Sequence, residues 1–377
     1  MKSTRAIRII TSLSVAIVLV SSVSSFGLGQ VSSSIARIDV FDSLNDRPEK
    51  TSKAENYLLV GSDTREGLTK QQMRELRVGS TATAAGGRSD TMLIIHLSKS
   101  RDRAYIISLP RDSLVVIPEH VSSSDKKTIV PDRQGKLNSA FSYGGAPLLI
   151  KTVERATSIK IDHYVEVSFA GFAGIVDALG GIEVCTKVDI DDPKSHLVLS
   201  AGVHTLDGIE ALKYVRTRDF DGRGDIGRMQ RQQQFMSAVL NKATSSGTLL
   251  NPFKVKNFIN ASLASVKLDS GLAPDDLLTL AKQMKNLSSG NVRTLTVPLS
   301  NPNGRVDGVG SVVIWDEILG ADLWTRVRDD LPLVDEVTPT PSASASASAS
   351  ATAKPTPVIV DKFKTRTADE NPCGEIK

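Results

Sequence analysis

Short apolar runs and polar segments alternate along the chain from residue 57 to about residue 333. The short runs at 57–60, 91–97, 104–109 and 182–185 predict buried β-strands, whereas 170–179, 225–242 and 315–328 have the pattern of helices. Gly180 and Gly181 follow the first of these helices and are expected to end it. This alternation is typical of one α/β domain.

Two of the predicted strands, 91–97 and 104–109, flank a short polar turn and are expected to pair as a hairpin. In a symmetric hairpin, Asp90 and Arg111 would lie opposite each other at the open end. Asp63 also follows a predicted strand, and ligands of α/β sheets collect at strand ends. The three residues could therefore share one site, although any one of them alone is more often a solvated turn residue.

The segment 211–234 is rich in arginine. Its guanidinium groups belong to Arg216, Arg218, Arg223, Arg228 and Arg231. If the chain is extended at 214–218, Arg216 and Arg218 point the same way, and if 225–242 is helical, Arg228 and Gln232 share one face near its start. Arginines beside a helix N-terminus favour phosphate binding. The alternative is a solvated loop whose arginines pair with nearby aspartates.

The N-terminal segment predicts an exported protein held at a membrane. Basic residues precede an uncharged, largely apolar run, so we expect a transmembrane anchor at 9–29, with 1–8 in the cytoplasm. A cleaved signal peptide is the alternative. We expect a stalk at 30–54 and the folded, extracytoplasmic domain at 55–335. A Ser/Ala/Pro-rich linker follows at 336–357, and the tail 358–377 carries Cys373.

Composition narrows the class of protein further. The 377 residues hold 46 Lys and Arg against 42 Asp and Glu, and this small positive balance argues against a dedicated nucleic-acid partner. Only two cysteines occur, Cys185 and Cys373, which excludes a zinc ribbon or a disulfide-dense scaffold. In an exported protein we expect these two to form a disulfide, with two separate thiols as the alternative.

The sequence has no Walker A segment, no G-x-S-x-G and no H-E-x-x-H, and its five histidines lack metal-ligand spacing. His96 is expected to be a hydrogen-bonded core residue. The match of 222–227 to G-x-G-x-x-G follows charged residues rather than a buried strand, so it does not predict a dinucleotide site. With these motifs absent, the residues left for catalysis are carboxylates, which can hold a hard cation, and arginines. This combination suits phosphoryl transfer.

The same residues resemble the LytR-CpsA-Psr family of bacterial cell-wall ligases over roughly residues 55–240. The motifs that carry this resemblance lie at 58–65, 88–92, 108–112, 136–145, 176–181, 206–218 and 225–232, in the order of the family. The linker and short cysteine-bearing tail are similar to those of actinobacterial members. The resemblance implies a three-layer α/β/α fold with a mixed central sheet and an apolar channel for a lipid.

By this resemblance, the protein is expected to be a phosphotransferase that moves a glycopolymer from a polyprenyl-pyrophosphate carrier to a cell-wall acceptor, peptidoglycan or a wall protein. Asp63 and Asp90 would bind Mg²⁺ or Mn²⁺, and Lys136 would lie near the sugar-phosphate end of the donor. The pyrophosphate would be held by Arg111, Arg216, Arg218, Arg228 and Gln232. The catalytic set would be Asp63, Asp90, Arg111, Arg216 and Arg218, with a pyrophosphatase side activity left open.

Two other functions are alternatives to this one, and the sequence argues against the second. A non-catalytic scaffold that binds a lipid-linked glycan or the wall would also need the apolar channel and the arginines. A membrane-bound transcription regulator would need a DNA-binding module in the cytoplasm, and the short segment before the apolar run leaves no room for one.

Overall fold

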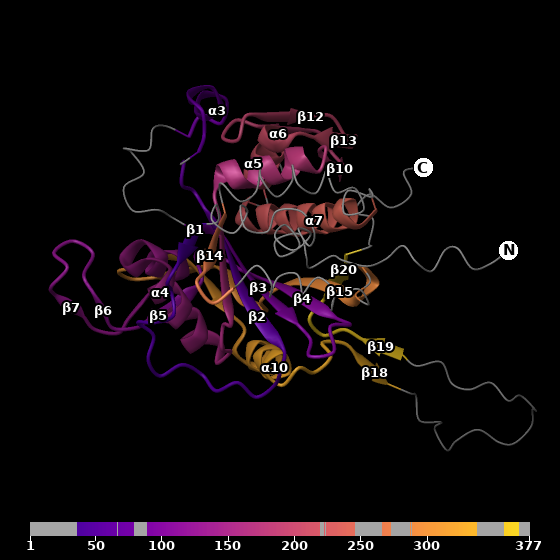
Figure 1. The fold of residues 1–377 in the computed structure, drawn as a ribbon. Helices are drawn as coiled ribbons and strands as arrows, with labels where there is room; N and C mark the ends of the chain where they lie inside the picture. Colours follow the sequence, from indigo (N-terminus) through magenta and orange to yellow (C-terminus); the bar gives the residue numbers. More distant parts are fainter. Residues whose placement is uncertain are drawn as a thin grey trace, which may run out of the picture.

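The computed structural model describes residues 36–65, 67–78, 89–218, 222, 224–245, 266–272, 287, 289–337 and 358–368. Within these residues, eight strands form a central sheet in the order β1-β14-β9-β2-β3-β4-β15-β20 (Figure 1). The strands are β1 (Ala36–Ile38), β14 (Val266–Asp269), β9 (His163–Val167), β2 (Glu55–Ser62), β3 (Ser89–Leu97), β4 (Ala104–Leu109), β15 (Val292–Thr296) and β20 (Arg366–Thr367). Three neighbouring pairs are parallel and four are antiparallel, so the sheet is mixed as expected.

Helices cover both faces of this sheet, which gives three layers (Figure 1). Alternate strand residues point to opposite faces. Leu59 and Leu93 pack beneath α5 (Phe169–Ala178), α6 (Gly208–Arg216) and α7 (Gly224–Ser245). Leu58 and Ile94 pack on the other face beneath α4 (Leu137–Thr157) and α10 (Glu317–Arg328). The central strands are therefore apolar on both sides, and their sequences read as short continuous runs.

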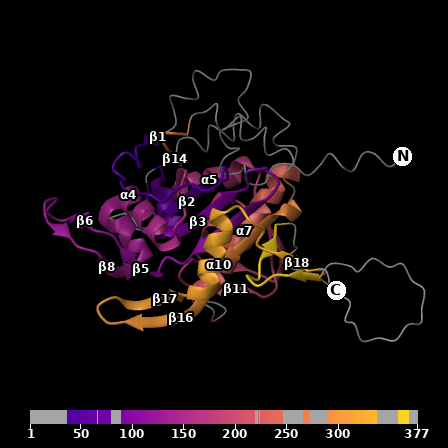
Figure 2. The same ribbon diagram turned by 90° about the horizontal axis from the view of Figure 1, so that it is seen from below.

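Smaller elements decorate the layers. Six two-stranded hairpins or ribbons lie among the described residues: β5 (Leu114–Ile117) with β8 (Arg133–Lys136), β6 (His120–Val121) with β7 (Ile129–Val130), β10 (Ile182–Thr186) with β13 (Gly202–Leu206), β11 (Ile190–Asp192) with β12 (Leu197–Leu199), β16 (Leu299–Val306) with β17 (Gly310–Trp315), and β18 (Asp335–Val337) with β19 (Val358–Val360). A short helix, α3 (Lys70–Glu75), lies between β2 and β3 along the chain. Figure 2 shows the β16–β17 hairpin projecting from the body of the protein.

The predicted hairpin register is confirmed. Met92 pairs with Leu109 and Leu97 pairs with Ala104, as in the symmetric arrangement. Because β2 is antiparallel to β3 and parallel to β9, strands β2, β4 and β9 all end where β3 begins. We call this the site end of the sheet, because several predicted site residues lie at or just beyond these strand ends.

One condition considered for the sequence is not met, and one predicted boundary is wrong. The segment 214–218 is not extended, because α6 continues to Arg216 after a capping box formed by Asp207 and Glu210. Trp315 does not start a helix, since it ends β17, and α10 begins at Glu317 with Asp316 as its N-cap. In both places a polar cap or a strand pairing, which hydropathy does not register, decided the boundary.

The folded domain is also larger at both ends than predicted. The expected stalk is wrong from residue 36 onward, because β1 pairs with β14 and both Val40 and Ala54 are buried. The expected tail is wrong over 358–368, where β19 and β20 join sheets and Phe363 is buried. Strands β1, β19 and β20 are too short to show a hydrophobic periodicity in the sequence. No helix in the described part of the chain is long and apolar enough to cross a membrane, and the predicted anchor at 9–29 lies outside the described residues.

A buried polar network connects the sheet to the end of α10. His96 on β3 is fully buried, and its Nδ1 lies 2.8 Å from Asn56 Oδ1 while its Nε2 lies 3.3 Å from Asp330 Oδ1. Arg103 Nη2 also donates to Asp330 Oδ1, at 3.0 Å. The interpretation of His96 as a hydrogen-bonded core residue is confirmed, and Asp330 is the shared acceptor.

The first prediction concerns this carboxylate. Burial disfavours its charge, but hydrogen bonds from His96 and the Lys99 backbone and the charge of Arg103 outweigh burial and lower the pKa of Asp330. A carboxyl whose pKa is lower in the folded than in the unfolded protein stabilises the fold at pH values above its unfolded pKa, near 3.9. This stabilisation is lost as the pH falls from there through the lower pKa of the folded state. We expect Asp330→Asn to lower the free energy of unfolding by about 1–3 kcal/mol at pH 7, and by less below pH 4.

Urea unfolding at the two pH values measures this difference. Asp329→Asn is the matched control, because Asp329 is partly exposed and pairs with the neighbouring Arg328. Equal losses for both variants at pH 7, or a loss in Asp330→Asn that does not shrink in acid, would contradict the assignment.

Candidate functional site

Several predicted site residues meet at the site end of the sheet. Asp63 directly follows β2, and Arg111 lies just beyond β4. Asp90 is the extra residue of a β-bulge, because Gly61 pairs with Thr91 while Ser62 pairs with Ser89. Bulges change the direction of a side chain relative to a regular ladder and are common beside functional sites. The backbone therefore brings the two aspartates and Arg111 to one end of three adjacent strands, although the side chain of Asp90 lies outside the described residues.

Helices α5 and α6 place Arg216 beside this end. Gly208 opens α6 against α5 so closely that a Cβ atom there would lie 2.4 Å from the carbonyl oxygen of Ala173. The close approach brings the C-terminal end of α6 to the first residue of α5. The Arg216 guanidinium consequently lies 5.4 Å from the centre of the Phe169 ring, and its Nη1 donates to the carbonyl oxygen of Leu76 at 3.3 Å.

Helix α7 brings a second arginine to the site. Arg228 is 5% exposed, and Gln232 lies one turn later and donates through Nε2 to the Val215 carbonyl oxygen at 3.2 Å. Gln233 fixes the helix to the sheet by donating to Ser108 Oγ at 3.1 Å and Thr296 Oγ1 at 2.8 Å. The prediction that Arg228 and Gln232 lie on one face of a helix is thus confirmed.

A buried carboxylate holds the segment between α6 and α7. Asp192, which is 1% exposed, accepts from the backbone N–H of Arg218 at 2.5 Å and from that of Ser195 at 2.9 Å. Arg231 Nη2 donates to the Thr217 carbonyl oxygen at 2.5 Å. Arg231 therefore holds the backbone between the two helices in place. Arg218 is fixed through its backbone, and the residue lines the cavity described next.

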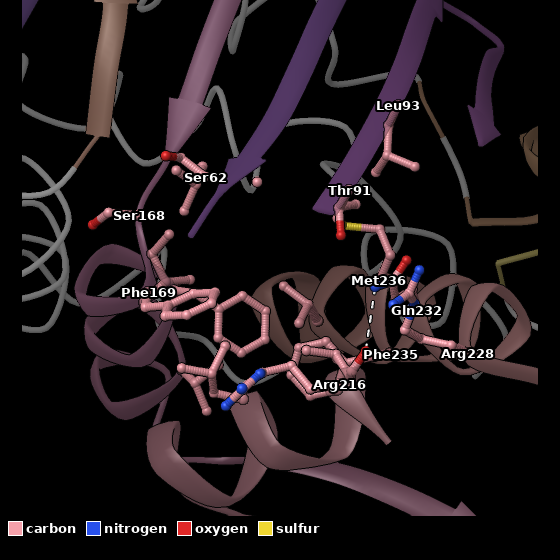
Figure 3. A pocket seen from close by; sticks show the side chains of 18 of the residues that line it. Ser62, Thr91, Leu93, Ser168, Phe169, Arg216, Arg228, Gln232, Phe235 and Met236 are labelled. Atoms are coloured by element: carbon pink, nitrogen blue, oxygen red, sulfur yellow. Dashed lines mark hydrogen bonds between the residues drawn. The ribbon is translucent and has the colours of Figure 1, made fainter. Parts of the chain in front are cut away.

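A cavity of about 220 Å³ lies between the sheet and helices α5, α6 and α7 (Figure 3). Apolar side chains form most of its wall, including Phe169, Phe172, Phe235 and Met236. Its polar lining residues are the cations Arg216, Arg218, Arg228 and Lys194, together with Gln232, Ser62, Thr91, Ser168 and Ser195. Figure 3 shows Arg216 near Phe169 and Arg228 beside Gln232. We call this the apolar cavity.

A second cavity, of about 340 Å³, adjoins the first. Arg228 and Gln232 line both of them, as do Thr91 and Leu93. The second cavity also contains Arg111 and Asp112. Asp112 Oδ2 accepts from Arg111 Nε at 3.2 Å, and its Oδ1 lies 3.0 Å from Lys136 Nζ. Lys136, predicted near the sugar-phosphate end, is thus joined to Arg111 through a carboxylate.

The structure brings together most, but not all, of the predicted residues. Arg216, Arg218, Arg228 and Gln232 line one cavity, and Arg111 joins Arg228 and Gln232 at the other. Asp63 lies at the same end of the sheet but is absent from both cavity walls as described. Arg223 lies outside the described residues. The aromatic wall and Asp112 were missed, because isolated apolar residues and one aspartate in a loop carry no distinctive pattern.

The two carboxylates Asp63 and Asp90 fit a hard divalent cation whose other ligands come partly from the substrate. Among described side chains, no group of three or more His, Cys, Asp or Glu could hold a metal ion. Mg²⁺ is commonly held by only one or two carboxylates together with phosphate oxygens. The backbone positions of Asp63 and Asp90 fit that mode better than a complete protein cage.

Cys185, on β10, is not a free thiol in the described part of the chain. It is half-buried and pairs in register with Val203 of β13. Its predicted partner, Cys373, lies outside the described residues, so their pairing stays a prediction.

Comparisons with known proteins identify the family. A sequence model of the LytR_cpsA_psr family matches residues 28–326, more than the motifs alone indicated. The chain is 38% identical over 273 residues to the probable cell wall biosynthesis protein LcpB of Corynebacterium glutamicum, covering 72% of this chain and 61% of LcpB. The chain therefore spans about three fifths of that relative's length.

A second relative is the polyisoprenyl-teichoic acid–peptidoglycan teichoic acid transferase TagU of Bacillus cereus, at 31% identity over 245 residues, with 65% of this chain and 74% of TagU covered. Among solved structures, that of TagT bound to LI-WTA superposes with a TM-score of 0.56 at 26% identity and covers 78% of this chain and 99% of TagT. The extent of these matches and the shared mixed α/β architecture lead to one conclusion: the chain belongs to the LytR_cpsA_psr family.

Proposed function

We propose that the protein is a membrane-anchored, extracytoplasmic phosphotransferase that moves a glycopolymer from a polyprenyl-pyrophosphate carrier to a cell-wall acceptor. The observation that carries this proposal is the composition of the apolar cavity, where arginines and Gln232 adjoin phenylalanines and methionine. A lipid pyrophosphate has the same two-part chemistry, an apolar chain next to a doubly charged head. The printed names of relatives in wall biosynthesis and teichoic acid transfer support the same class of reaction.

The arginines would supply the electrostatic part of catalysis. Breaking the pyrophosphate bond adds charge to the leaving phosphate, and guanidinium groups fixed in advance stabilise that charge without reorganisation. Arg216 is fixed by its contact with Phe169 and by its bond to the Leu76 carbonyl, and the burial of Arg228 limits its movement. With a lipid chain filling the cavity, the surrounding apolar wall would exclude water and so strengthen each of these interactions.

The metal is part of the proposal. Asp63 and Asp90 would hold Mg²⁺ or Mn²⁺ together with phosphate oxygens, and the ion would neutralise charge as the lipid phosphate departs. The N-terminal anchor would keep the domain beside the membrane to which the lipid donor is confined, which raises its local concentration.

The second prediction tests metal and reaction together. With a lipid-pyrophosphate-linked glycan and purified wall glycan, chelation by EDTA is expected to abolish transfer, and Mg²⁺ to restore it. Asp63→Asn and Asp90→Asn should raise the Mg²⁺ concentration needed for half-maximal rate at least about tenfold, because each removes a charged ligand.

Asp102→Asn is the control, because Asp102 is an exposed carboxylate of the turn at the opposite end of β3 and β4. Donor binding without product, indifferent to Mg²⁺, would favour the non-catalytic scaffold instead. Unchanged Mg²⁺ dependence in both site variants would contradict the proposed metal ligands.

The third prediction concerns the disulfide between Cys185 and Cys373, which we propose on the grounds of an oxidising compartment. Alkylation of the unfolded, unreduced protein should label neither cysteine, and reduction should add two labels by mass spectrometry. The bond would close a long loop and stabilise the protein by about 5 kcal/mol in the chain-entropy model. Two labelled thiols without reduction would contradict the pairing.

A further inference from the structure

The second cavity differs in chemistry from the apolar cavity that it adjoins. Where the apolar cavity has three phenylalanines, the second has Arg111, Asp112 and Asn303. Arg228 and Gln232 stand at the boundary because they line both. A phosphate group bound at these two residues would therefore have an apolar space on one side and a polar space on the other.

One wall of the second cavity is a β-bulge in the β16–β17 hairpin. Asn301 pairs with Ile314 and Gly304 pairs with Val312, so Pro302 and Asn303 together stand opposite Val313 alone. Proline cannot donate to a strand ladder, and a bulge redirects the side chains of the strand that carries it. Pro302 and Asn303 both line the cavity as a result.

Hydrogen bonds fix this wall relative to Arg111. The Val313 N–H donates to the Asp112 carbonyl oxygen at 2.9 Å, and Trp315 Nε1 donates to Ser113 Oγ at 2.8 Å. The Asp112 carboxylate is held in turn by Arg111 and Lys136. The bulge is thus anchored to the chain segment that follows β4, which a surface hairpin serving only as a connection would not require.

The geometry points to the second cavity as the binding site of the acceptor, a hydroxyl-bearing saccharide, with Pro302 and Asn303 as specificity-determining residues. This inference rests on the proposed function. In phosphoryl transfer the attacking and leaving oxygens lie roughly in line across the phosphorus. The lipid phosphate leaves toward the apolar cavity, so the attacking hydroxyl approaches from the opposite side of Arg228 and Gln232, where the second cavity lies.

The step balances as a simple displacement. The acceptor oxygen forms a bond to the phosphorus that carries the glycan, and the bond from that phosphorus to the bridging oxygen breaks. The lipid monophosphate departs with the bonding electron pair, and the hydroxyl proton passes to water. The chemistry of the wall suits a sugar, because the Asn303 amide can both donate to and accept from hydroxyl groups, while Pro302 and Leu299 offer apolar surface to its C–H face.

The test separates acceptor from donor. Full-length protein carrying Asn303→Trp would be assayed for transfer from a lipid-pyrophosphate-linked disaccharide to uncrosslinked peptidoglycan glycan strands. We expect the KM for the glycan strands to rise at least tenfold, with the KM for the donor changed less than twofold. Binding of the donor alone, measured by fluorescence with a labelled donor, should also be unchanged. Arg305→Ala is the matched control, since Arg305 is exposed on the same hairpin outside the cavity wall.

Each outcome bears on a different claim. A raised donor KM in Asn303→Trp would mean that the second cavity holds the glycan of the donor, and would overturn the inference. An unchanged acceptor KM would overturn it as well. Failure of the unsubstituted protein to transfer at all would reject the proposed function instead, and donor binding by that protein would still be measured separately.

Discussion

Arg216→Ala is expected to lower kcat/KM for glycopolymer transfer about 100- to 1,000-fold, with most of the loss in kcat. The guanidinium is held between the Phe169 ring and the Leu76 carbonyl, on the wall of the apolar cavity. Its charge would meet the charge that develops on the departing phosphate. Removing one fixed donor from such a site typically costs about 3–4 kcal/mol of transition-state stabilisation. Steady-state kinetics with saturating Mg²⁺ measure the loss.

Arg155→Ala provides the comparison. Arg155 is an exposed arginine of α4, on the other face of the sheet, where it pairs with Asp132 at 2.6 Å. This variant should retain activity within about twofold, because an exposed ion pair contributes little. A similar loss in both variants would indicate a general effect on the fold, and full activity in Arg216→Ala would remove the arginine from the mechanism.

Phe172→Asp is expected to raise the KM for a long-chain polyprenyl donor at least about tenfold. Phe172 lines the apolar cavity and packs against Phe235, with 5.3 Å between ring centres. A lipid entering this space would have to strip water from the new carboxylate, and it would lose the apolar contact of the ring. A donor carrying a single isoprene unit should be affected less than about twofold, because it places far fewer carbons against the apolar wall.

Phe172→Leu keeps the cavity apolar and should behave nearly as the natural protein with both donors. Melting temperatures of the two variants show whether the substitution has disturbed α5, in which Phe172 is only half-buried. An equal change in KM for long and short donors would contradict the assignment of this cavity to the lipid.

The sequence was a good guide to strands and helices whose hydrophobic pattern is strong. The β3–β4 hairpin has the predicted register, and α5 ends before the two glycines. It was a poor guide where a short segment gains its stability from distant residues. Strands β1 and β20 are too short for a pattern, and each exists because a partner strand supplies its hydrogen bonds.

The same distinction between strong local patterns and distant contacts applies to the candidate site. Arg216, Arg218, Arg228 and Gln232 were identifiable because arginines gather within one segment beside an amphipathic helix. The apolar wall was not identifiable residue by residue, because Phe169, Phe172 and Phe235 have the spacing of ordinary core positions. Only the packing of α5, α6 and α7 leaves space between them instead of closing it.

By itself, the sequence determined which charged residues could gather at a candidate site, since the types of charged residue and their spacing along strands and helices are local properties. Tertiary structure decided that these residues line two adjoining cavities. The approach of α6 to α5 at Gly208 and the bulge at Pro302 and Asn303 depend on contacts between segments far apart in the chain. Such contacts follow from the way whole layers pack, and no local pattern of residues encodes them.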